Sequence, residues 1–186
     1  MNTLKVINKM LTTIGEAPVN TLDDPDELTA KAISMLDYET IVLQSSDLWF
    51  NHYPAVLPLD VNSEIVLPPN TVMVDANNTS IIQRGLKLYN KYNNTYVFAT
   101  PLEVSLTVHL DFEEMPMTAR LYVAATAVWL FETQEQADGS VSNILRFNLE
   151  RAKNRFQDEN LQQQNQNIYR NASVRPKYNR QILGSY

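Results

Sequence analysis

The spacing of apolar residues along the chain changes twice, and this constrains the fold more than any other feature of the sequence. Near the N-terminus apolar residues recur every three or four positions, which is typical of a helix with one buried face. Between residues 51 and 112 they alternate with polar residues, which indicates strands. From residue 113 the helical spacing returns. The pattern predicts a helical bundle interrupted by a β-rich insertion.

Residues 1–50 are expected to form the first half of the bundle, with two helices. The first runs from Thr3 to Ile14 and is followed by Gly15, which can adopt the left-handed conformation that ends many helices. The second runs to about Leu48 from Pro25, with Asp24 as its N-cap, because aspartate favours the cap and proline the first helical position. Both helices need later helices to bury their apolar stripes.

Residues 51–112 form the predicted insertion, where several prolines exclude long helices. Its clearest strand runs from Glu103 to Phe112, with strict alternation of polar and apolar side chains. A hairpin is expected before it, formed by residues 86–89 and 96–98 around a turn at Asn93 and Asn94.

Residues 113–161 form the predicted second half of the bundle. A strongly apolar helix begins at Pro116, with Glu113 and Glu114 beside its positive end, and a turn at residues 138–140 separates it from a last helix. The fold class that follows is α+β: a discontinuous antiparallel helical bundle with a β-rich insertion and an extended C-terminal arm.

The arm comprises residues 162–186, which begin with a run of Gln and Asn and lack a periodic apolar face. It still carries aromatic, aliphatic and basic residues, which indicates a segment that becomes ordered on a partner; a solvated tail is the alternative. The predicted partner-binding residues are Tyr169, Arg170, Arg175, Lys177, Tyr178, Arg180, Ile182, Leu183 and Tyr186.

Charge and composition exclude several classes of function and site. The net charge is -6, so the chain as a whole lacks the positive field that gathers nucleic-acid phosphates. The acids concentrate before residue 60, whereas only basic charges follow Glu159. Four glycines form no phosphate-binding loop, and the absence of cysteine excludes thiolate sites. No run of residues is long and apolar enough for a membrane anchor or signal peptide.

Few residues in the sequence are candidates for catalysis or metal binding. Asp111, Glu113 and Glu114 could supply the two carboxyl groups of a glycoside hydrolase, although two of them are better explained as helix-start acids. His52 and His109 have no second ligand at a spacing common in metal sites. We therefore expect no catalytic, metal or cofactor-binding residues and no cofactor.

Two segments resemble the tail tubular protein A family of T7-like podoviruses. Residues 14–22, IGEAPVNTL, match a pattern that follows the family's first helix, and residues 111–116, DFEEMP, match one where its sheet returns to helix. Both occur in order and at the right separation, and the resemblance extends to about Asn160. It does not cover the last residues, so it does not say which partner the arm contacts.

This resemblance implies a non-enzymatic virion tail protein that is assembled in the host cytoplasm. The family forms a dodecameric ring, the head-to-tail adaptor, between the portal and the nozzle made by tail tubular protein B. The tail fibre attaches nearby, and genomic DNA passes through without specific binding. The alternatives are a tail-associated hydrolase of polysaccharide or cell wall and a regulatory helical protein with a disordered tail.

Overall fold

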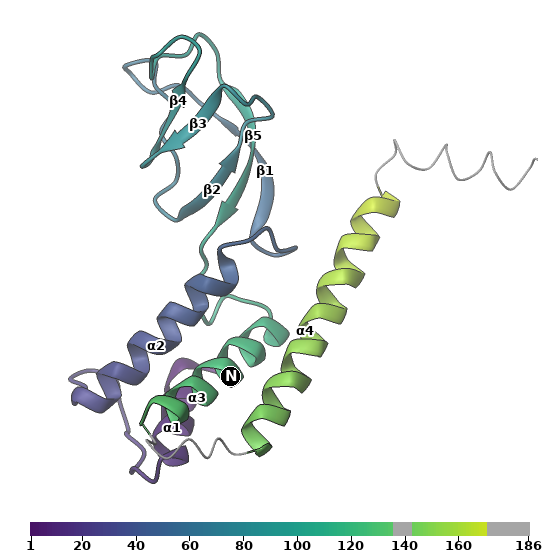
Figure 1. The fold of residues 1–186 in the computed structure, drawn as a ribbon. Coiled ribbons are helices and arrows are strands. Elements are labelled where there is room, and N and C mark those ends of the chain that lie inside the picture. The colour runs from purple at the N-terminus through teal and green to yellow at the C-terminus, as the bar shows by residue number, and fades with distance from the viewer. Residues whose placement is uncertain (136–142, 171–186) are drawn as a thin grey trace, which may run out of the picture.

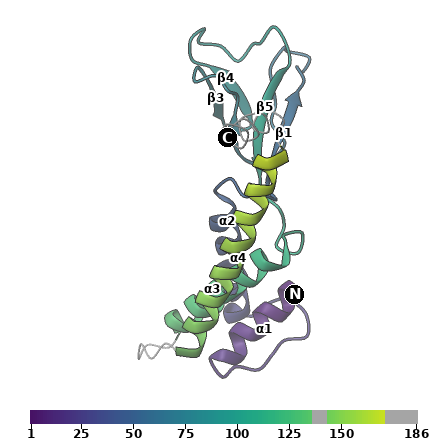
Figure 2. The ribbon, with the colours of Figure 1, turned by 90° about the vertical axis from the view of Figure 1, so that its right-hand side faces the viewer.

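The computed structural model describes residues 1–135 and 143–170 of the 186-residue chain. They form an elongated molecule with a helical bundle at one end and a β domain at the other (Figures 1 and 2). The described residues contain four helices and five strands, all strand pairs being antiparallel. The α+β fold class predicted from the sequence is confirmed.

Four helices form the bundle, and their two pairs are separated in the sequence by the β domain. They are α1 (Thr3–Thr13), α2 (Glu27–Gln44), α3 (Met117–Glu135) and α4 (Asn143–Arg170). Helix α3 is central, because it contacts each of the other three. Phe131 of α3, Ile7 and Met10 of α1, and Leu36 of α2 are fully buried in one core. The early helices are therefore completed by the late ones.

The ends of α1 agree with the sequence, whereas the start of α2 does not. Asn2 caps α1, and Gly15 beyond its end has φ +88°, as expected for a left-handed residue. The N-cap of α2 is Asp26, whose Oδ1 accepts from the Thr29 backbone N–H at 2.7 Å, so the prediction of Asp24 was wrong. An N-cap needs extended backbone, which Asp26 has, while Asp24 has φ +128°. Helix α2 ends at Gln44, before the predicted Leu48.

The β domain packs a three-stranded sheet against a hairpin. Strands β1 (His52–Leu57) and β2 (Thr71–Asp75) flank β5 (Leu102–Val108) in the order β1-β5-β2. The apolar side predicted for this strand is confirmed as far as Val108, since Val104, Leu106 and Val108 are buried in the second core. The strand ends there and does not reach the predicted Phe112, which packs in the bundle core, and Thr107 on the predicted polar side is also buried. This core is separate from that of the bundle, and among the described residues only the partly buried Leu110 packs against both.

The hairpin of the β domain differs from the prediction. Strand β4 (Lys87–Asn90) pairs with β3 (Ile81–Arg84), not with residues 96–98. The turn between them contains Gly85 at φ +61°, a conformation that favours glycine in a two-residue hairpin turn. The expected turn at Asn93 and Asn94 does exist, but it closes only an isolated bridge between Asn90 and Thr95.

Helix α4 continues past Leu161 to Arg170, so the extended arm does not begin at residue 162 as predicted. The Gln-rich run has no apolar face, but glutamine has a good helix propensity and no proline or glycine interrupts this stretch. In Figure 1 the last turns of α4 stand clear of the β domain.

The predicted turn at 138–140 lies outside the described residues. Within the described ranges, no helix is both long and apolar enough to cross a bilayer.

Candidate functional site

The predicted partner-binding residues fall mostly beyond the described part of the chain. Tyr169 and Arg170 lie in the last turn of α4. Arg175, Lys177, Tyr178, Arg180, Ile182, Leu183 and Tyr186 lie outside the described residues. The role predicted for these residues therefore stays a prediction, and the surfaces described below belong to the bundle and the junction.

Glu113 accepts hydrogen bonds at the start of a helix, but that helix is α1 and not the predicted α3. The backbone N–H and the hydroxyl of Thr3 both donate to Glu113 Oε1, at 3.1 and 3.2 Å. The positive end of a helix dipole and these two donors favour the ionised carboxyl. The hydrogen bond from the Thr3 backbone, followed by that from its side chain, lowers the pKa of Glu113. This carboxylate therefore joins the two halves of the bundle.

Asp111, at the other end of this acidic segment, acts electrostatically on α2. Partial burial raises the pKa of Asp37, with His109 lowering it and Asp111 raising it further. Glu113 thus pairs with Thr3, while Asp111 influences Asp37. The described residues hold no group of three or more possible metal ligands.

A threonine, a histidine and an aspartate meet where α2 leads into β1. The Thr107 hydroxyl donates to Asp47 Oδ1 at 2.6 Å, and His52 Nδ1 lies 3.2 Å from that hydroxyl and 3.5 Å from Asp47 Oδ1. In a nucleophilic site the hydroxyl donates to the base. Here it donates to the carboxylate, and Thr107 is only 1% exposed. The three side chains therefore have a structural role: they link the segment after α2 to strands β1 and β5.

The junction between bundle and β domain is built from two buried amides. Gln44 donates through Nε2 to the carbonyl of Leu110 at 2.8 Å and accepts the Leu110 N–H at 2.9 Å. Asn51 donates to the Gln44 carbonyl at 3.1 Å and accepts the Leu48 N–H at 2.9 Å. Gln44 and Asn51 are both fully buried. Buried, satisfied polar contacts favour one local geometry, and these hydrogen bonds link the end of α2 to the segment between β5 and α3.

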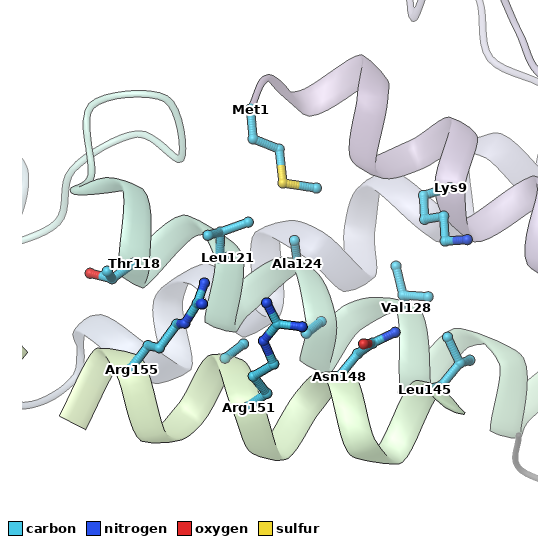
Figure 3. Close-up of a pocket in the computed structure, with 12 residues that line it drawn as sticks. Met1, Lys9, Thr118, Leu121, Ala124, Val128, Leu145, Asn148, Arg151 and Arg155 are labelled. Carbon is cyan, nitrogen blue, oxygen red and sulfur yellow. The ribbon is translucent and has the colours of Figure 1, made fainter. Parts of the chain in front are cut away.

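A hollow on the bundle lies between α1, α3 and α4, and we call it the α1/α3/α4 groove (Figure 3). It has a volume of about 290 Å³. Its floor is apolar, and its polar lining, among the residues that the structure describes, includes Lys9, Arg151 and Arg155 but no carboxylate. Figure 3 shows both guanidinium groups pointing from α4 toward α1. The lining residues are Met1, Lys9, Thr118, Leu121, Ala124, Ala125, Val128, Leu145, Asn148, Arg151, Ala152 and Arg155.

Helix α2 carries an exposed apolar face, which we call the α2 face: Tyr38, Ile41 and Val42, which are 64%, 52% and 48% exposed. Tyr38 lies about 200° around the helix from the buried Leu36, so it points away from the core. The exposed residues Asp23, Asp24, Asp26 and Glu27 lie at the N-terminal end of the same helix. The α2 face is thus apolar with an acidic end.

Sequence reasoning found neither the groove nor the junction. The groove combines residues from three helices, so no local pattern marks it. The polar residues Gln44 and Asn51 gave a weak signal, since they flank the end of α2.

Comparisons of the sequence with known proteins identify a family. A sequence model of the tail tubular protein family matches residues 4–166, which span nearly all of α1, most of α4 and every element between them. The chain is also 29% identical over 126 residues to a protein named tail tubular protein A from Klebsiella phage KP34; this alignment covers 67% of this chain and 68% of that protein. The family match extends over most of the sequence, and the chain belongs to the tail tubular protein family.

Proposed function

We propose that this protein is the adaptor of a short-tailed bacteriophage: a ring-forming head-to-tail connector that joins the portal to the tail nozzle. Its subunits form a dodecameric ring that contributes to the DNA ejection conduit. The nozzle is the tail tubular protein B of the phage, and the tail fibre attaches nearby. The protein is a component of the virion tail, assembled in the cytoplasm of the bacterial host, and has no catalytic role.

The observation that carries this proposal is the buried polar junction between the two cores. A connector must hold two different partners at a fixed spacing, which requires two folded ends that do not move freely against each other. The contacts of Gln44 with Leu110 and of Asn51 with Leu48 meet this requirement. Membership of the tail tubular protein family supplies the phage tail as the setting.

The surface of the bundle supports a ring. Closed rings use heterologous contacts, in which one patch of each subunit binds a different patch of its neighbour. The α1/α3/α4 groove and the α2 face are two such patches of different chemistry on one bundle. The hydrolase alternative receives no such support, because Glu113 is bound by Thr3 and Asp111 acts on Asp37.

The test is assembly on the portal. Purified protein is mixed with portal dodecamers and the complexes are imaged by electron microscopy. A second ring stacked on the portal is expected. A stable monomer that never binds the portal would contradict the proposal and favour the regulatory alternative, whereas hydrolysis of envelope polysaccharide by the isolated protein would favour the enzyme.

A further inference from the structure

The α1/α3/α4 groove has unbalanced charge. Lys9, Arg151 and Arg155 are exposed at its lining, and within the described residues no ion pair involves any of them. By contrast, Lys31 and Lys87 are each paired with a glutamate. An apolar floor with three cations that have no ion pair in the described part of the chain favours an occupant that presents apolar side chains beside acids.

The C-terminal end of this chain does not have that chemistry. The residues after Glu159 carry Arg170, Arg175, Lys177 and Arg180 and no acid. Like charges placed together across an interface oppose binding. The arm is thus a poor occupant for the groove, although it is rich in tyrosine.

The α2 face does have that chemistry. Tyr38, Ile41 and Val42 offer apolar side chains on a helix. Toward the N-terminus of α2 the same side carries Lys31, whose charge is paired with Glu135, and then the acidic Glu27. Glu27 lies about 1,100° before Tyr38 along the helix, which is close to three full turns, so both point to the same side. Aromatic residues are frequent anchors of interfaces, and Tyr38 is the largest exposed side chain on this face.

The two surfaces face different directions on the bundle. Helix α3 lies between α2 and α4, contacting both, and Figure 1 shows α2 and α4 on opposite sides of it. A subunit therefore has difficulty using its own α2 face to fill its own groove. It can bind one neighbour through each surface, and such heterologous contacts repeat from subunit to subunit until a ring closes.

We infer that the groove between α1, α3 and α4 of each subunit receives the α2 face of the next subunit, with Tyr38 over the apolar floor and the acidic end of α2 beside Lys9, Arg151 and Arg155. The inference rests on the proposed ring and assigns the contact that closes it. A volume of about 290 Å³ suits one or two side chains, not a whole helix, so α2 lies across the groove.

Cross-linking tests this contact directly, because the chain contains no cysteine. A double variant, Tyr38→Cys with Asn148→Cys, places one thiol on the α2 face and one in the groove lining. The full chain is assembled on portal dodecamers and treated with a short bis-maleimide. The matched control pairs Asn148→Cys with Tyr92→Cys, since Tyr92 is 86% exposed in the β domain.

The expected result is a ladder of covalent dimers, trimers and larger species for the first pair and monomers for the control. Monomers alone from the first pair, in rings that form normally, would overturn the inference and leave the proposed function standing. Dimers without larger species would indicate a two-fold contact and would also overturn it. Failure of the unsubstituted protein to form any ring on the portal would contradict both.

Charge reversal gives an independent readout. Arg151→Glu with Arg155→Glu is expected to reduce ring formation at least tenfold, measured as the protein concentration needed for half-maximal assembly. The control Arg146→Glu with Lys91→Glu reverses two exposed charges outside the groove lining. Equal assembly of the two double variants, with unchanged circular dichroism, would show that the groove charges do not serve the contact.

Discussion

Replacing Gln44 by methionine should uncouple the bundle from the β domain with little change in side-chain volume. Methionine keeps the length of the side chain, but it cannot donate to the Leu110 carbonyl, and its sulfur is only a weak acceptor for the Leu110 N–H. Each main-chain group left without a partner costs about 1–3 kcal/mol, and Leu110 is only partly buried, so the lower part of that range applies to both. The free energy of unfolding should therefore fall by about 2–3 kcal/mol.

The assay is urea denaturation followed by far-UV circular dichroism and by tryptophan fluorescence. Gln83→Met is the matched control, because the Gln83 side chain donates to the Gly85 carbonyl at 3.1 Å at the surface. The control should change the free energy of unfolding by less than about 0.5 kcal/mol. A Gln44→Met variant as stable as the control would refute the reasoning, because it would mean that these hydrogen bonds do not hold the junction.

A Gln44→Glu variant separates loss of hydrogen bonds from loss of packing. A buried carboxylate can accept the Leu110 N–H but cannot donate to the carbonyl, and burial favours the neutral acid, which can do both. Its folded pKa should then lie above the unfolded value. Relative to the unsubstituted protein at each pH, the variant should be most destabilised near pH 7 and should recover as the pH falls through its folded pKa. A deficit independent of pH would indicate a packing defect.

Four further outcomes are expected. Because the folded pKa of Glu113 is lowered, its contribution is complete above the ordinary glutamate pKa of about 4.3 and is lost as the pH falls through the folded pKa. Thermal melts should show a gap between the unsubstituted protein and Glu113→Gln that is widest near pH 7 and closes near pH 3; a gap that widens in acid would contradict this. Glu114→Gln should leave any measured glycosidase activity unchanged, and loss of such activity with fold and assembly intact would support the enzyme. Deleting residues 171–186 should preserve the circular dichroism spectrum but weaken pull-down by the portal, unless the segment is only a solvated tail. In a density map of the assembled ring, acids should predominate on the lumen wall, with the basic residues from Arg170 onward on its outer or portal-facing side; basic residues concentrated in the lumen would point to gripping of DNA instead.

Where the spacing of apolar residues was regular, it predicted the type of element correctly. Helix α1, the inward side chains of β5 and the return to helix before α3 all follow from the spacing of apolar residues. The errors arose at the ends of elements, because one side chain or one backbone angle determines where an element begins or ends. The cap of α2 moved from Asp24 to Asp26 because only the latter has extended backbone, and the hairpin formed at Gly85 because that turn needs a positive φ.

The end of α4 shows a second limit. An apolar stripe predicts which helices are buried, but a helix can continue beyond its buried part when no residue breaks it. The Gln-rich run contains no such residue, so the helix reaches Arg170 and the predicted boundary at residue 161 has no counterpart in the backbone. The partner-binding role assigned to the arm stays a prediction.

By itself, the sequence determined that this chain has two helical halves around a β-rich insertion, because apolar periodicity reports which faces must be buried. Only the tertiary structure decided how those parts are joined and which surfaces they expose. Gln44 meets Leu110 across 66 positions of sequence, and the cations of the groove come from α1 and α4, at the two ends of the described chain. Such contacts depend on the packing of distant segments, and local residue patterns carry no information about which distant segments meet.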